Sequence, residues 1–167
     1  QKRLLDVLAA AEGAEAARDR MLVDLLLGTG VRLGSALALD VGDVDLDHGE
    51  LTLRSTKGNR PTAVLLPKVL ARKLARFLQG RGDGPVFTAG DRRISVRHAQ
   101  RRLGLWMGKA GIVGRSAHSL RHSYATGLLA RTGDLRLVQA AMCHASIVST
   151  TIYAQVDRAK LRAAVGA

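Results

Sequence analysis

Four short blocks of this sequence carry residue types that could together act on a phosphodiester. They are 29–33 (TGVRL), 55–59 (STKGN), 118–122 (HSLRH) and 143–153 (CHASIVSTTIY). Arg32 and Arg121 could stabilise charge on the non-bridging phosphate oxygens, because arginine forks bind such oxygens without a metal. His118 and His144 could hydrogen-bond the phosphate or move a proton near neutral pH. Each block alone is a weak signal, but the ordered set on one basic chain favours phosphoryl transfer.

The remaining steps need a nucleophile and an acid. Tyr153 is the candidate nucleophile, since a phenol is activated by a neighbouring base or positive field, which the arginines and histidines would supply. Lys57, in a turn between two short β-type runs, is the candidate general acid for the leaving 5′-oxygen. The second candidate tyrosine, Tyr124, follows Arg121 on the same predicted helix, and we interpret it as a packing residue.

Zinc is the competing chemistry for the histidines. His118 and His122 are four residues apart on a predicted helix, and Cys143 with His144 could complete a ligand set. The helical pair lacks the glutamate that a metalloprotease has after its first histidine, and adjacent Cys and His ligands are awkward. We therefore expect no metal and no other cofactor.

The elements that must position these residues are mostly helices. Apolar periodicity and capping residues predict helices over 2–11, 14–27, 33–39, 68–78, 95–109, 116–130, 134–142 and 158–165. Between 40 and 67 the pattern changes to short β-type runs separated by turn signals at 47–49 and 57–59. The sequence therefore predicts a mostly α fold with a small antiparallel β-sheet.

The charge is unevenly distributed. The 167 residues have a net charge of +12, yet residues 1–50 hold five basic and ten acidic residues, against 21 and four in the rest. A strongly basic region favours a polyanion such as nucleic acid. Aromatic residues make up only 3% of the chain, which argues against base stacking and favours contacts to a duplex backbone. The single cysteine excludes an internal disulfide, and we expect no membrane partner.

Basic residues outside the four blocks form a predicted DNA-binding face. Five of them fall within eleven residues that hold no acidic neighbour, and two flank the turn that carries Lys57. A basic helix of this kind can lie in the major groove or hold phosphates. The predicted DNA contacts are Arg54, Arg60, Arg92, Arg93, Arg97, Arg101 and Arg102.

From about 14 to 156 the chain resembles the catalytic domain of the tyrosine recombinases, the phage-integrase or Xer/Cre-like family. The family's motifs are matched residue by residue. The resemblance implies six catalytic positions, Arg32, Lys57, His118, Arg121, His144 and Tyr153, and site-specific DNA cleavage and rejoining through a 3′-phosphotyrosyl intermediate. Two positions depart from the pattern: Ser35 stands where an acidic residue is frequent, and Cys143 where glycine is usual.

The resemblance also implies a larger assembly. We expect residues 1–167 to be the single catalytic domain at the C-terminus of a longer recombinase, without its N-terminal core-binding domain. We expect a homotetramer on synapsed double-stranded DNA and a monomer or weak oligomer without DNA. The tail 154–167 would be exchanged between protomers or folded back. A cytoplasmic, nucleoid-associated protein of prokaryotic, phage or mobile-element origin fits this role.

Two rivals share these residues. A type IB topoisomerase uses the same nucleophile but relaxes supercoils, and the short length and the tyrosine block favour a recombinase over it. A non-catalytic DNA-binding module derived from an integrase is the second rival, and the six intact positions argue against it.

Overall fold

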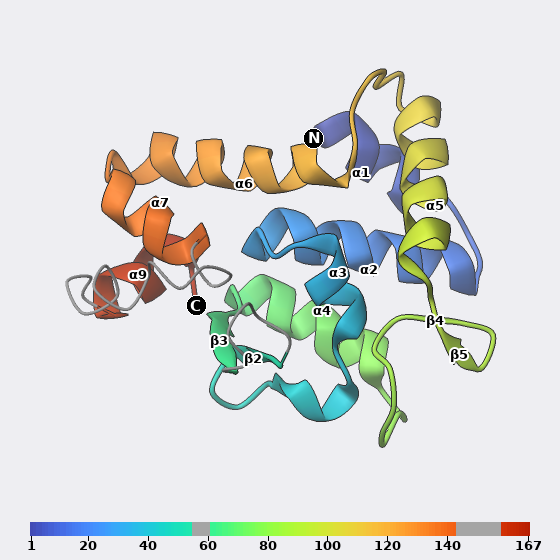
Figure 1. The fold of residues 1–167 in the computed structure, drawn as a ribbon, viewed down its shortest axis with the longest axis horizontal. Helices are drawn as coiled ribbons and strands as arrows, with labels where there is room; N and C mark the ends of the chain where they lie inside the picture. Colours follow the sequence, from blue (N-terminus) through green and yellow to red (C-terminus); the bar gives the residue numbers. More distant parts are fainter. Residues whose placement is uncertain (55–60, 143–157) are drawn as a thin grey trace.

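The computed structural model describes residues 1–54, 61–142 and 158–167, which are mainly helical with two small antiparallel sheets. The predicted fold class is therefore confirmed. Figure 1 shows α2 between α6 on one side and α4 on the other. The helices are α1 (Lys2–Ala9), α2 (Ala14–Thr29), α3 (Leu33–Ala38), the 3-10 turn η1 (Val41–Asp43), α4 (Lys68–Leu78), α5 (Val96–Lys109), α6 (Ala117–Thr132), α7 (Leu135–Met142) and α9 (Arg158–Val165).

The helix ends follow from local chemistry. Ser95 starts α5 by accepting a 3.2 Å hydrogen bond from the His98 amide, and Ser116 starts α6 in a reciprocal cap with Ser119. α2 runs past the predicted stop at Gly28. This glycine lies within the helix, and a Cβ there would lie 2.8 Å from Leu70 Cδ2 of α4. The helix ends instead at Gly30, which adopts the left-handed conformation that favours glycine.

The sheet lies where the sequence predicts it. β1 (Val44–Asp45), β2 (Glu50–Leu53) and β3 (Thr62–Leu65) pair antiparallel in that order. A second hairpin of β4 (Thr88–Ala89) and β5 (Arg92–Arg93) was not predicted, because two-residue strands show no alternation. Its turn contains Gly90 at a φ of 62°.

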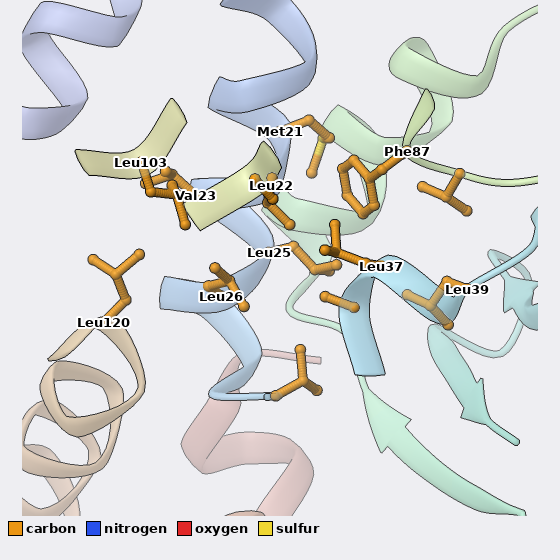
Figure 2. Packing of buried hydrophobic residues seen from close by; sticks show 14 of the residues in the cluster. Met21, Leu22, Val23, Leu25, Leu26, Leu37, Leu39, Phe87, Leu103 and Leu120 are labelled. Carbon is orange, nitrogen blue, oxygen red and sulfur yellow. The ribbon is translucent and has the colours of Figure 1, made fainter. Parts of the chain in front are cut away.

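The buried apolar side chains form two clusters. The larger contains side chains from each of the helices α1 through α5 and also Leu120 at the start of α6. Figure 2 shows its centre, where Leu22, Leu25 and Leu26 of α2 meet residues from α3 and α5. The smaller cluster contains Tyr124 and Leu128 of α6 with residues of α7, α9 and β3. α6 therefore crosses from one cluster to the other.

α2 and α6 each span 16 residues. Within the described ranges, no helix has the length and apolar character needed to cross a membrane.

Candidate active site

A groove of about 410 Å³ lies where the start of α3, the outer face of α5 and the start of α6 meet. Its basic lining residues are Arg32, Arg115, His118 and Arg121. Arg32 and His118 are exposed, whereas Arg121 is half-buried. The fold therefore brings three of the six predicted catalytic residues to one groove.

Main-chain carbonyls hold Arg121. Its Nη1 donates to the carbonyl of Gly30 at the end of α2, and its Nη2 donates to the carbonyl of Met142 at 2.7 Å. These acceptors lie on different elements, so the guanidinium is fixed from two directions. Because Met142 precedes Cys143, the described range 61–142 ends beside Arg121.

A tight turn places Arg32 in the same groove. Thr29 Oγ1 donates to the Leu25 carbonyl at 2.7 Å and accepts a 3.4 Å hydrogen bond from the Val31 amide. Gly30 has a φ of 65°, and a Cβ there would lie 2.3 Å from the ring of Tyr124. Arg32 is the N-cap residue of α3, directly after this turn. Thus the turn that exposes Arg32 also supplies an acceptor to Arg121.

The guanidinium groups of Arg32, Arg115 and Arg121 and the imidazole of His118 share one groove, and together they can act on a tetrahedral anion. Arginine forks bind phosphate oxygens in pairs and keep their charge at any physiological pH. A preorganised positive field of this kind stabilises the charge that develops in a phosphoryl-transfer transition state. The described part of the site therefore suits phosphate binding, and chemistry needs a nucleophile in addition.

Tyr124 is not that nucleophile. Its side chain is 8% exposed and packs in the smaller cluster. Burial raises the pKa of its phenol to about 12, because the charged form loses its hydration, while the charges of Arg131 and Arg121 act in the opposite direction. A phenol so hard to ionise is a poor nucleophile, in agreement with the packing role predicted for it.

The described residues contain no group of three His, Cys, Asp or Glu side chains arranged to hold a metal ion. Two members of the alternative zinc set, Cys143 and His144, lie outside the described ranges.

A model of the phage integrase family matches residues 1–160. The chain belongs to this family. Tyrosine recombinase XerA of Thermococcus kodakarensis is 37% identical over 169 residues, and Tyrosine recombinase XerC of Mycobacterium bovis is 37% identical over 179 residues. Each match covers 98% of this chain but only 58% and 60% of the two relatives. The chain thus spans less than two thirds of the length of these curated relatives.

Solved integrase-family structures have the same fold. The crystal structure of XerA recombinase matches with a TM-score of 0.73 at 30% identity, over 97% of this chain and 60% of that one. The integrase of mycobacterium phage Brujita matches with a TM-score of 0.78 at 27% identity, over 98% and 55%. The catalytic domain of bacteriophage HP1 integrase matches in fold, with a TM-score of 0.64 at 21% identity, over 98% and 88%. The fold is that of an integrase catalytic domain.

The other half of the predicted integrase site lies outside the described residues. Lys57 and Arg60 fall in 55–60, and His144 and Tyr153 fall in 143–157, as does Cys143. Their assigned roles stay predictions.

Apart from Arg60, which lies outside the described ranges, the predicted DNA-binding arginines divide into two groups. Arg92, Arg97 and Arg101 are exposed, and the last two line a hollow of about 270 Å³ with Ser95 and His98. These three stay predicted contacts.

The second group is held within the protein. Arg102 Nε donates to Asp19 at 2.7 Å, and Arg93 donates to Asp40 and to the carbonyls of Leu37 and Leu39 at the end of α3. Arg54 donates to Asp43 at 2.5 Å but is mostly exposed. These three arginines thus have partners within the protein, and their predicted contacts with DNA stay predictions.

Several residues near the site were not predicted from the sequence. Arg115 and Gln100 line the groove, and the cap at Ser116 could have placed Arg115 at the entrance of α6. Asp43, which is buried, lies with Ser35 and Arg54 around a shallow hollow. A carboxylate is thus present beside Ser35, the position where the family frequently has an acidic residue.

Proposed function

We propose that this chain is the catalytic domain of a site-specific tyrosine recombinase that cleaves and rejoins duplex DNA. The observation that carries the proposal is that Arg32, His118 and Arg121 line one groove, in a chain of the phage integrase family. The carbonyl of Met142, which Arg121 binds, directly precedes the segment that holds His144 and Tyr153.

In the proposed reaction the Tyr153 oxygen attacks the phosphorus and its proton passes to a neighbouring imidazole. The bond from phosphorus to the 5′-oxygen breaks, and the Lys57 ammonium gives that oxygen a proton. Arg32 and Arg121 stabilise the charge on the non-bridging oxygens. The 3′-phosphotyrosyl link conserves the energy of the broken ester, so a second 5′-hydroxyl reverses the step without an added energy source.

Double-stranded DNA is the proposed partner. XerH, a recombinase structure with 28% identity and a TM-score of 0.73, was solved bound to its difH substrate. The basic residues of α5 and the groove beside it support the same class of partner here. The setting we propose is the nucleoid of a prokaryotic cell, or DNA of a phage or mobile element within it.

We further propose that four copies assemble on two DNA sites and exchange their tails 154–167. In the structure α9 packs on its own chain: Leu161 is 3% exposed, and the Gly166 carbonyl accepts a 2.7 Å hydrogen bond from the Lys68 amide. Arg162 also pairs with Glu50 at 2.8 Å. The same contacts, made by the tail of a neighbour, would link one active site to the next.

The proposal is tested with a pool of nicked duplexes of randomised sequence. A nick beside the cleavage position lets the short cleaved strand diffuse away, so the protein stays attached to DNA and survives detergent. The expected result is an adduct that is lost in Tyr153→Phe, retained in Tyr124→Phe and unaffected by EDTA.

Other outcomes favour the rival functions. Binding without any adduct favours a non-catalytic module, and relaxation of supercoiled plasmid by this chain alone favours a topoisomerase. An adduct that persists in Tyr153→Phe contradicts the proposed nucleophile.

A further inference from the structure

Asp19 is a buried carboxylate with four donors. Its side chain is 2% exposed. Oδ1 accepts from Arg18 Nε at 2.9 Å and Nη2 at 2.7 Å, and Oδ2 accepts from Arg102 Nε at 2.7 Å and Trp106 Nε1 at 2.8 Å. Both oxygens are therefore saturated, and the donors lie in fixed directions around them.

The donors join elements that are distant in the sequence. Asp19 and Arg18 belong to α2, whereas Arg102 and Trp106 belong to α5, 83 and 87 residues further along the chain. Arg18 also donates from Nη1 to the Thr88 carbonyl at 3.0 Å, which ties in β4. One carboxylate thus connects α2, α5 and the hairpin before α5.

A second acid supports the same arginine. Glu15, one turn before Asp19, lies 3.2 Å from Arg102 Nη1. The Arg102 guanidinium also lies 5.6 Å from the centre of the Trp106 ring. Arg102 is therefore engaged along its length within the protein, which is a different task from neutralising a DNA phosphate.

The opposite face of α5 lines both hollows of the basic surface. Val96, Gln100 and Gly104 border the groove that contains Arg32, His118 and Arg121, and Arg97 with Arg101 borders the second hollow. Successive helix residues are 100° apart, so a small rotation or slide of α5 would displace every one of these side chains. Apolar contacts resist such a shift weakly compared with directional bonds from a fixed carboxylate.

We propose that Asp19 is a positioning residue that fixes the rotation and register of α5 through Arg102 and Trp106, so that the outer face of this helix meets DNA beside the phosphate-binding groove. This inference rests on the proposed function. It makes Arg102 part of an internal clamp and leaves the exposed Arg97 and Arg101 as the contacts of α5 with the backbone of DNA.

The test compares Asp19→Asn with Asp24→Asn. Asp24 lies on the same helix and pairs with Lys73 of α4 at 2.8 Å, so the control loses the same charge and leaves α5 untouched. The measurement is the slope of the logarithm of the duplex-binding constant against the logarithm of salt concentration, which reports the number of phosphate contacts.

We expect Asp19→Asn to reduce the magnitude of this slope by about one to two, while Asp24→Asn keeps the wild-type slope. In the wild type, Arg97→Gln should reduce the magnitude of the slope by about 0.9. In Asp19→Asn the same change should have a much smaller effect, because the contact of Arg97 with phosphate is already lost there. Trp106→Phe removes one of the four donors to Asp19 and should also reduce the magnitude of the slope. This variant replaces Asp19→Asn in the test if Asp19→Asn does not fold.

A merely structural role would lower the melting temperature and leave the slope unchanged. The inference is overturned if the Asp19→Asn and Asp24→Asn slopes agree. It is also overturned if Arg97→Gln changes the slope by the same amount in the wild type and in Asp19→Asn. Wild-type protein that neither binds the duplex nor forms the Tyr153 adduct instead overturns the proposed function, and the inference with it.

Discussion

The two apolar clusters differ in size and in the part of the site that each supports. The larger buries side chains from α1 through α5 and carries the turn that exposes Arg32. The smaller consists of a few residues from β3, α6, α7 and α9, on either side of the segment that holds His144 and Tyr153. Local stability follows buried apolar area, so the larger cluster, which supports the turn that carries Arg32, should be the more stable of the two.

Arg121 connects the two clusters. It lies on α6 between Leu120 of the larger cluster and Tyr124 of the smaller one, and it binds a carbonyl from each side. In the proposed recombinase, Arg121 would therefore bind the substrate phosphate and also link the two clusters.

Replacing this link should have the largest effect. Arg121→Ala removes a transition-state charge and both carbonyl contacts, so the rate of adduct formation on a nicked duplex should fall by about 10³-fold or more while duplex binding persists. Arg136→Ala, an exposed arginine of α7, is the control and should cleave at the wild-type rate. Normal cleavage by Arg121→Ala would remove it from the mechanism.

A leucine-to-alanine substitution in each apolar cluster should show whether the two clusters unfold separately. Leu25 and Leu128 are both fully buried, one in each cluster, and replacement by alanine should cost about 2–5 kcal/mol in each case. Amide hydrogen exchange should then differ in its location. Leu128→Ala should expose α7 and α9 with α2 unaffected, whereas Leu25→Ala should lower protection throughout, and identical exchange patterns would mean that the clusters unfold as one.

The turn between α2 and α3 should tolerate no side chain at Gly30. Gly30→Ala combines a positive φ with an overlap of the Tyr124 ring, and should lower the free energy of unfolding by about 2–4 kcal/mol. Gly108→Ala is the control, because this helical glycine has open space around it and the change should be neutral or stabilising. Chemical denaturation measures both, and a Gly30→Ala variant as stable as the wild type contradicts the geometry of the turn.

The smaller cluster should also respond to alkaline pH. Tyr124 has its pKa raised to about 12 in the folded state against 10.0 in the unfolded chain, so the unfolded state loses its proton first. Its contribution is fully present below pH 10 and is lost as the pH rises to about 12, a change on the order of 2 kcal/mol. Urea unfolding at pH 9 and 11.5 should show a smaller decline in Tyr124→Phe than in the wild type, and equal declines would show that the ring is not buried.

The smallest effect should come from the surface pair that attaches α9. Arg162→Ala removes the contact with Glu50 and should lower the free energy of unfolding by about 1 kcal/mol or less, because the pair is partly exposed. Exchange of the α9 amides should rise in this variant, with the exposed Lys160→Ala as control. Equal exchange in the two variants would show that apolar packing alone holds the helix.

Much of this fold could be predicted from the sequence, because its helices carry strong local signals. α4, α7 and α9 have regular apolar stripes, and α5 and α6 have serine caps, so their bounds were predicted to within one or two residues. The hairpin of β4 and β5 has no such signal, since tertiary contacts of Arg93 and Arg18 hold it in place.

The site was predicted in part. The grouping of Arg32, His118 and Arg121 was predicted from the ordered set of short blocks and from the family resemblance that they carry, because each block alone is a weak signal. The tasks of Arg93 and Arg102 could not be predicted, because their partners, Asp40 and Asp19, lie more than 50 residues away in the sequence. The sequence shows where an arginine stands, but it does not show which carboxylate pairs with it in the fold.

The carbonyls of Gly30 and Met142 have a consequence for how this site can evolve. Every amino acid contributes the same carbonyl to the main chain, so no point substitution at 142 deletes the acceptor that Arg121 uses there. Side chains around the site can therefore drift from one descendant to another while the anchoring of the arginine is inherited through the path of the backbone. In the proposed recombinase, the residues that contact DNA could therefore change while the anchor of Arg121 stays in place.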